Sequence, residues 1–234
     1  MPKEALLEQF FTSLIGGDRR GARAIVDEVI QAGCSAEQVL ARLFWPTLEH
    51  VQDLYRHDQM TKLAHHFATR LMRSLVDQLQ PRLAQAPRRG QKVLMICGPE
   101  EPEELAAQMA ADLMDADGYD VYFAGGGVAN DEIVNQLGEM KADVLAVFSA
   151  TAGTLPYLRQ LIDYLHEIGV CPHLQVAVGG GVFNRAEGLA EEIGADLWAA
   201  TPEEFVAAVS NQPRHRADDA QRTVGRKRRS RQAA

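Results

Sequence analysis

Cysteine is scarce in this chain: Cys34, Cys97 and Cys171 are the only three among 234 residues, and they lie far apart. Their number and spacing exclude a disulfide framework and a CxxC metal site, and they favour a reducing, cytoplasmic environment. Long hydrophobic runs are also missing, because charged residues interrupt every apolar stretch before the roughly 20 residues that a membrane-spanning helix needs. The start of the chain, with acidic Glu4, lacks the pattern of a signal peptide. We therefore expect a cytoplasmic protein without a membrane partner.

Several functional motifs are absent too. No GxxxxGK[ST] occurs, and neither glycine run forms GxGxxG after the first expected strand, which argues against P-loop and dinucleotide-binding functions. No third ligand at a fixed spacing completes a closed zinc site with the neighbouring histidines at 65 and 66. No substrate-transforming constellation is visible, so the sequence predicts a binding protein rather than an enzyme.

Charge is distributed unevenly along the chain. The net charge is −8, yet residues 211–234 hold eight basic residues against two aspartates and carry +6, which leaves −14 on the rest. A basic segment with so few apolar residues cannot offset the entropy of ordering, so we expect a disordered tail. Three roles are open for this tail: it contacts nucleic acid through the phosphates, it binds an acidic partner, or it remains solvated without a partner.

Residues 1–80 show helical periodicity only. Apolar residues recur three and four positions apart in several short stretches, and one stripe runs through Leu63, Phe67, Leu71, Leu75 and Leu79. Pro46 interrupts or kinks the helix that Ser35 and Gln38 open as a capping box. The pattern predicts an antiparallel bundle of four or five helices, followed by a linker rich in proline and arginine over residues 81–90.

Residues 91–210 alternate between short apolar strands and helical stretches. Strands are expected at 92–97, 120–124, 144–149 and 174–178, with a fifth near 196–198 and a helix from about 185 to 193. This order predicts a flavodoxin-like, doubly wound, five-stranded parallel sheet of the α/β class, with a ligand crevice at the carboxyl ends of the strands. Glycine runs at 125–127 and 179–181 follow two of these ends. Glycine lets a ligand approach the backbone, although such runs also serve simply as turns.

The order of parts, a helical bundle followed by a five-stranded α/β domain, resembles the cobalamin (B12)-binding module of methionine synthase, corrinoid methyl carriers and light-sensing cobalamin regulators. The resemblance covers roughly residues 4–210 and is carried by stretches such as VAVGGGVFN, EEIGADLWAATPEEFV and LFWPTLEHVQDLYRHDQMTKLAHHFATRLM. It implies cobalamin as the cofactor and a helical cap over the upper face of the corrin ring.

The family's lower-ligand motif, Asp-x-His-x-x-Gly, is degenerate in this chain. Glu101 stands at the Asp position, Glu103 replaces the cobalt-binding His, and Ala106 replaces the Gly. A carboxylate is a poor substitute for imidazole on cobalt. We favour the interpretation that this stretch is the acidic start of a helix. For the cofactor, we expect either that cobalamin is bound base-off, without a lower His from this loop, or that no cobalamin is bound.

The remaining matches concern the nucleotide tail and the upper face. Ser149 and Thr151 occupy the positions of a family serine and leucine that contact the tail, and Gly126, Gly179 and Gly180 belong to the glycine runs. A helix-side cap is the alternative role for Ser149. For the upper face, the resemblance assigns three residues: Tyr55 at the family's aromatic position, His65 in place of its Glu, and His66 as the metal or axial ligand. Exposed helical histidines without any ligand are the alternative.

Three functions follow from these observations. The first is a non-catalytic cobalamin-type (tetrapyrrole) sensor or regulator that signals to a protein partner, as a monomer or as a homo-oligomer. The second is a corrinoid methyl-carrier protein that serves a separate methyltransferase. The third is an interaction module on the same scaffold that holds no cofactor, or that binds haem or a bilin through His66.

Overall fold

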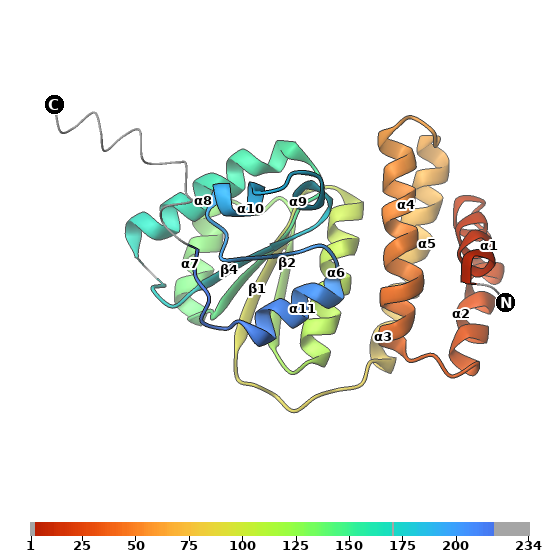
Figure 1. The fold of residues 1–234 in the computed structure, drawn as a ribbon, viewed down its shortest axis with the longest axis horizontal. Coiled ribbons are helices and arrows are strands. Elements are labelled where there is room, and N and C mark those ends of the chain that lie inside the picture. The colour runs from red at the N-terminus through yellow and green to blue at the C-terminus, as the bar shows by residue number, and fades with distance from the viewer. Residues whose placement is uncertain (1–2, 170, 218–234) are drawn as a thin grey trace. The chain divides into compact units, whose positions relative to one another are not determined.

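The chain is divided into two compact units in the computed structural model, which describes residues 3–169 and 171–217. The helical unit spans Met1–Ala86 and the α/β unit spans Pro87–Ala234 (Figure 1). The division falls within the segment 81–90 that was expected to be a linker. The helical unit continues past residue 80 because Leu83 is buried and the backbone N–H of Ala84 donates to Glu37 Oε1 at 2.7 Å.

Over its described residues, 3–86, the helical unit contains five α-helices joined by short connections. They are α1 (Lys3–Ile15), α2 (Arg19–Gln31), α3 (Ala36–Val39), α4 (Trp45–Arg56) and α5 (Lys62–Leu79), and a 3₁₀ turn, η2, follows at Gln80–Arg82. The capping box of Ser35 and Gln38 opens α3 as expected. A π turn, η1 (Leu40–Phe44), joins α3 directly to α4, so the chain stays helical up to Pro46, which lies in the first turn of α4 and has no N–H to donate.

The buried face of α5 differs from the stripe expected from the sequence. Leu71, Leu75 and Leu79 are buried, but Leu63 and Phe67 are 63% and 43% exposed. The first half of the helix instead buries His65, Ala68, Thr69 and Met72. Helical residues three and four apart share a face, so His65 continues the buried side, whereas Leu63 and Phe67 fall beside it. The prediction that these two residues face the core was wrong.

The α/β unit alternates strands and helices in the expected order. Its elements are β1 (Lys92–Cys97), α6 (Glu101–Ala116), β2 (Asp120–Gly125), α7 (Asn130–Met140), β3 (Val144–Phe148), η3 (Ala152–Thr154), α8 (Leu155–Ile168), β4 (Gln175–Gly179), α9 (Gly181–Arg185), α10 (Leu189–Ile193), β5 (Leu197–Ala199) and α11 (Pro202–Asn211). All strand pairs are parallel, in the order β2-β1-β3-β4-β5. This confirms the fold class predicted from the sequence. Of the helix expected over 185–193, only α10 (Leu189–Ile193) forms, after Gly188 with its positive φ of 79°, and the separate short helix α9 already ends at Arg185.

Helices cover both faces of this sheet (Figure 1). On one face, side chains such as Ile96 and Val147 pack with α7 and α8 in a single apolar cluster. On the other face α6 and α11 pack together, and the Phe148 ring of β3 lies 5.0 Å from the Phe205 ring of α11. Alternate residues of a strand point to opposite faces, so each strand feeds both layers.

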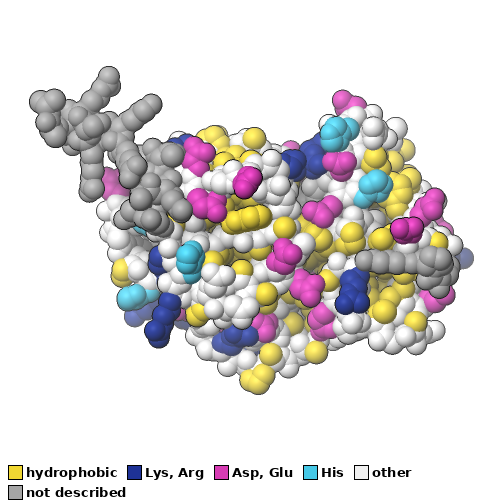
Figure 2. Space-filling model, in the orientation of Figure 1, with side chains coloured by type: hydrophobic (Ala, Val, Ile, Leu, Met, Phe, Trp, Pro, Cys, Tyr) yellow, Lys and Arg dark blue, Asp and Glu magenta, His cyan; other side chains and the backbone are white. Residues whose placement is uncertain are grey.

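The chain after α11 is partly held to the sheet. Gln175 Nε2, at the start of β4, donates to the carbonyl oxygens of Gln212 and His215 at 2.8 and 3.0 Å, and Asp196 accepts from the backbone N–H of Ala217. Residues 212–217 therefore differ from the disorder expected for 211–234, and residues 218–234 lie outside the described part. Among the described residues, no helix combines the length and apolar character that crossing a bilayer requires. Figure 2 shows acidic and basic side chains interspersed on the visible surface.

Candidate functional site

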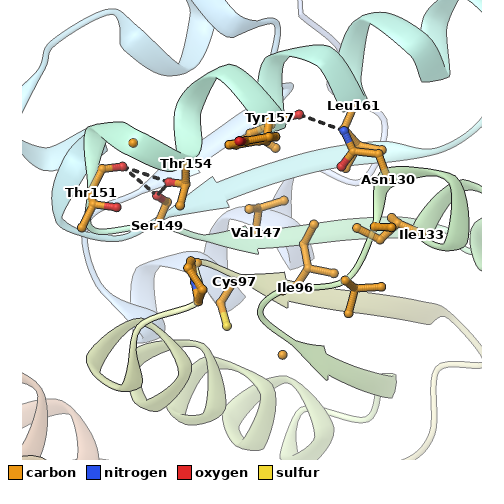
Figure 3. Close-up of a pocket in the computed structure, with 18 residues that line it drawn as sticks. Ile96, Cys97, Asn130, Ile133, Val147, Ser149, Thr151, Thr154, Tyr157 and Leu161 are labelled. Carbon is orange, nitrogen blue, oxygen red and sulfur yellow. Dashed lines mark hydrogen bonds between the residues drawn. The ribbon is translucent and has the colours of Figure 1, made fainter.

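A cavity of about 600 Å³ opens at the carboxyl edge of the sheet in the α/β unit. It lies beside the ends of β1 and β3, which is the switch point of this strand order, between the first turns of α7 and α8 (Figure 3). The floor consists of buried Ile96, Ile133, Val147, Leu158 and Leu161. The rim includes exposed residues at 127, 129, 153 and 157, so the cavity communicates with solvent.

Glu103 lies in the first turn of α6 with only 1% of its surface exposed. Its Oε1 accepts hydrogen bonds from the backbone N–H groups of Ala150 at 2.6 Å and Thr151 at 3.2 Å, in the loop that follows β3. Its Oε2 accepts from the backbone N–H of Glu100 at 3.4 Å, which closes a capping box. The carboxylate also lies against Gly98, where a Cβ atom would collide with it. Glu103 therefore joins the loops after β1 and β3.

Ser149 and Thr151 belong to the same cluster. The Ser149 hydroxyl, 2% exposed, contacts the Thr154 hydroxyl, donates to the carbonyl of Thr151 at 3.3 Å and lies 3.4 Å from Glu103 Oε1 (Figure 3). Both Ser149 and Thr151 line the cavity. The structure thus brings together three of the residues selected from the sequence, Glu103, Ser149 and Thr151, of which Glu103 lies outside the cavity lining.

The glycine runs have several structural roles. A Cβ at Gly126 would collide with the carbonyl of Gly98, and one at Gly180, where φ is +102°, would collide with the carbonyl of Ser149. At Gly179 a Cβ would lie 2.9 Å from the Phe148 ring. The protein's own atoms therefore fill the space above these three glycines. By contrast Gly127 lines the cavity and faces open space.

The remaining candidates from the sequence lie apart from this cluster. Glu101 begins α6 and is partly exposed. In the helical unit, His65 is buried and its ring stacks on Tyr55 with centroids 4.0 Å apart. His66 is partly exposed, with its ring 6.1 Å from that of His65. Within the described residues no three His, Cys, Asp or Glu side chains form a metal-binding group.

Comparison with known proteins identifies the family. A sequence model of the B12 binding domain matches residues 91–210, and a second B12 binding domain model matches residues 6–80. The chain belongs to the B12-binding domain family. This confirms the resemblance noted from the sequence.

Two relatives match along most of the length of this chain. Trimethylamine corrinoid protein 2 of Methanosarcina acetivorans is 23% identical, over 84% of this chain and 91% of the relative. Dimethylamine corrinoid protein 1 of the same organism is 22% identical, over 88% and 97%. The solved structure of the Methanosarcina barkeri monomethylamine corrinoid protein shares the fold, with a TM-score of 0.79 at 16% identity over 89% of this chain and 98% of that one. The likeness to these relatives therefore spans most of the chain, and the solved structure shows that the fold is shared.

The residues at the carboxyl edge fit one part of a corrinoid and not another. A neutral, apolar group fits the cavity, because none of the described residues that line it is charged. A protein nitrogen on the lower face of the metal does not fit, because Glu103 stands at the histidine position and its carboxylate is directed at the backbone N–H groups of Ala150 and Thr151. The carboxylate that stands where the sequence resemblance expects a histidine is thus engaged by the protein's own backbone.

Sequence reasoning missed the α8 side of the cavity. Thr154 and Tyr157 line it, and Asn130 Nδ2 donates to the carbonyl of Tyr157 at 3.2 Å across its mouth. The stretch TAGTLPY contains a signal from which this side of the cavity could have been predicted. Its proline lies in the first turn of α8 and indicates that this helix starts at the carboxyl edge of the sheet.

Proposed function

We propose that this protein binds a corrinoid and carries it for a separate methyltransferase, without catalysing a reaction itself. The observation that carries the proposal is the match to the two amine corrinoid proteins, which spans both the helical and the α/β unit in the same order. A match over one domain alone would be compatible with many functions, because one fold serves many functions. A match over both domains, in the same order, favours a function like that of the two relatives.

The position and the volume of the cavity also support the proposed ligand binding. It lies at the switch point of a parallel sheet, where α/β folds bind their ligands, and its volume falls within the range of small-molecule sites, about 300–1,000 Å³. We propose that the corrinoid is bound base-off and without a lower histidine from the loop after β1, because Glu103 occupies that position. His66, partly exposed on α5, is the proposed axial or hydrogen-bonding residue of the helical unit.

A direct binding experiment tests the proposal. The full-length protein is mixed with methylcobalamin at micromolar concentration and passed over a gel-filtration column with detection of the corrin absorbance. We expect corrinoid to co-elute with the protein in a ratio near one to one. Elution of all corrinoid in the small-molecule volume contradicts corrinoid binding and with it the carrier function.

A sensor or regulator is the second candidate, and one observation favours it. A carrier cycles its metal between oxidation states with a tunable lower ligand, and the buried Glu103 offers none. Transfer of a methyl group from the loaded protein to an acceptor, with a corrinoid-dependent methyltransferase present, separates the candidates. Carriage predicts turnover, while regulation predicts tight binding without transfer and a change in association with a protein partner.

A further inference from the structure

Trp198 is an exposed aromatic side chain on the last strand of the sheet. In the sheet formed by the described strands, β5 has only β4 beside it, and 45% of the surface of Trp198 is exposed. Its partner on β4 is Val178, which belongs to the apolar cluster with α7 and α8, so the indole points to that face of the sheet. Leu197 and Ala199 alternate with it and are buried on the other face. The described part of the chain thus leaves the outer edge of β5 and much of this indole uncovered.

The chain after α11 is held beside the beginning of this strand. The Arg216 guanidinium donates to the carbonyl of His173 at 2.6 Å, and the backbone N–H of Ala217 donates to Asp196 Oδ1 at 2.7 Å. Asp196 comes directly before β5 and lies two residues from Trp198, which is about 7 Å at the rise of a strand. The last described residue, Ala217, is therefore fixed close to the exposed indole.

Charge is divided sharply among the parts of the chain. Residues 1–86 hold ten basic and ten acidic residues, whereas residues 87–217 hold eight basic against 20 acidic residues, a net charge of −12. Residues 218–234, outside the described part, hold six basic residues and two aspartates, a net charge of +4. Glu191 and Glu192 lie on α10, which packs on the face of the sheet to which the indole points. The basic residues are therefore attracted to the α/β unit rather than to the neutral helical unit.

The chain beyond Ala217 is long enough for its first basic residue to reach the indole. Arg222 is the fifth residue after Ala217, and five extended residues span up to about 17 Å, which exceeds the roughly 7 Å between Asp196 and Trp198. A guanidinium stacks on the face of an aromatic ring, and an indole is the best partner for such a contact. Because the connecting chain is short, the two groups meet at an effective concentration in the millimolar range.

We propose that residues 218–234 dock on the outer edge of β5 in the same chain, with the Arg222 guanidinium stacked on Trp198 and the later basic residues against the acidic surface of the α/β unit. The inference does not depend on the proposed corrinoid binding. Of the three roles open for the basic tail, it selects the binding of an acidic partner, and that partner is the chain's own α/β unit. Docking there also covers an edge strand, which otherwise presents main-chain hydrogen-bonding groups to other chains.

Trp198 itself reports the contact. In the full-length Trp45→Phe protein it is the only tryptophan, and acrylamide quenching of its fluorescence measures how accessible the indole is. Quenching is compared at about 20 mM and about 500 mM NaCl, between which the range of ionic attraction falls from about 20 Å to about 4 Å. Arg222→Gln removes the stacking guanidinium, and Arg231→Gln, which removes the same charge farther along the chain, is its matched control. Thermal melts by circular dichroism show that the variants are folded.

The expected result is a shielding of Trp198 that depends on salt and on one arginine. For the Trp45→Phe protein and its Arg231→Gln variant, the quenching constant rises about twofold from low to high salt, because the guanidinium that covers one face of the ring is released. Arg222→Gln shows the high-salt value at both concentrations.

Three outcomes would overturn the proposal. Equal quenching of the Trp45→Phe protein at both salt concentrations leaves residues 218–234 to solvent or to nucleic acid. An effect of Arg231→Gln as large as that of Arg222→Gln shows a general effect of charge rather than a stacked guanidinium. A shielding that weakens when the protein is diluted a hundredfold assigns these residues to a second copy of the chain.

Discussion

Replacing Glu103 with alanine should destabilise the α/β unit far more than replacing its neighbour Glu101. The substitution removes two short hydrogen bonds from a carboxylate to the backbone N–H groups of Ala150 and Thr151. Hydrogen bonds to charged groups contribute about 1.5–3 kcal/mol each, and water partly replaces them at these half-buried amides. The two contacts at 3.4 Å add little. We therefore expect a loss of about 3 kcal/mol.

The measurement uses the two tryptophans, since Trp45 lies in the helical unit and Trp198 in the α/β unit. In a Trp45→Phe background, Trp198 fluorescence follows urea unfolding of the α/β unit alone. With a slope of about 1.5 kcal/mol per molar urea, Glu103→Ala lowers the midpoint by about 2 M. Glu101→Ala removes an acid from the same helical turn and costs about 0.5 kcal/mol through the helix dipole. If the two variants unfold within about 1 kcal/mol of each other, Glu103 does not hold the loop.

The other predictions concern backbone geometry and titration. Gly180→Ala should cost more than about 3 kcal/mol, because a positive φ and a collision with the Ser149 carbonyl add up, whereas Gly127→Ala, in open space, should cost about 1 kcal/mol, both by urea unfolding. Burial opposes ionisation of Glu37, but hydrogen bonds from a hydroxyl and a backbone N–H outweigh it and lower the pKa of Glu37 below 4.5. The unfolding free energy of the helical unit should therefore fall as pH drops through that lowered pKa, and Glu37→Gln should flatten this part of the curve; identical curves would contradict the hydrogen bonds. Burial raises the pKa of the Cys171 thiol above 9.0, so iodoacetamide should alkylate it more slowly at pH 8 than a cysteine in a short peptide, as measured by mass spectrometry; equal rates would refute the shift.

The main architectural features were predictable because they depend on local patterns. Near-continuous apolar runs at 92–97 and 144–148, typical of strands buried on both faces, alternate with helical stretches, and this alternation leads to a parallel sheet with helices on both faces. The position of the crevice followed from the strand ends. The inner face of α5 did not follow, because Leu63 and Phe67 continue a helical stripe that packing with the other helices leaves exposed.

The candidate site was predictable only in part. Ser149 and Thr151 follow a strand end and were found from that position. The role of Glu103 was not visible, because its hydrogen-bond partners lie 47 and 48 residues away in the chain, across the edge of the sheet. The α8 wall was missed for the same reason, since Thr154 and Tyr157 meet α7 only when both helices pack on the sheet.

Sequence by itself determined the fold class, the order of the two units and the family, since periodicity, turn residues and motif spacing are properties of neighbours along the chain. Tertiary structure alone decided what the carboxyl edge can hold. Close packing puts Phe148 over Gly179 and leaves a cavity between α7 and α8, and it turns the acid that replaces the family's histidine toward backbone N–H groups. Which space is filled and which stays open depends on contacts between distant segments, and the order of residues does not specify such contacts one by one.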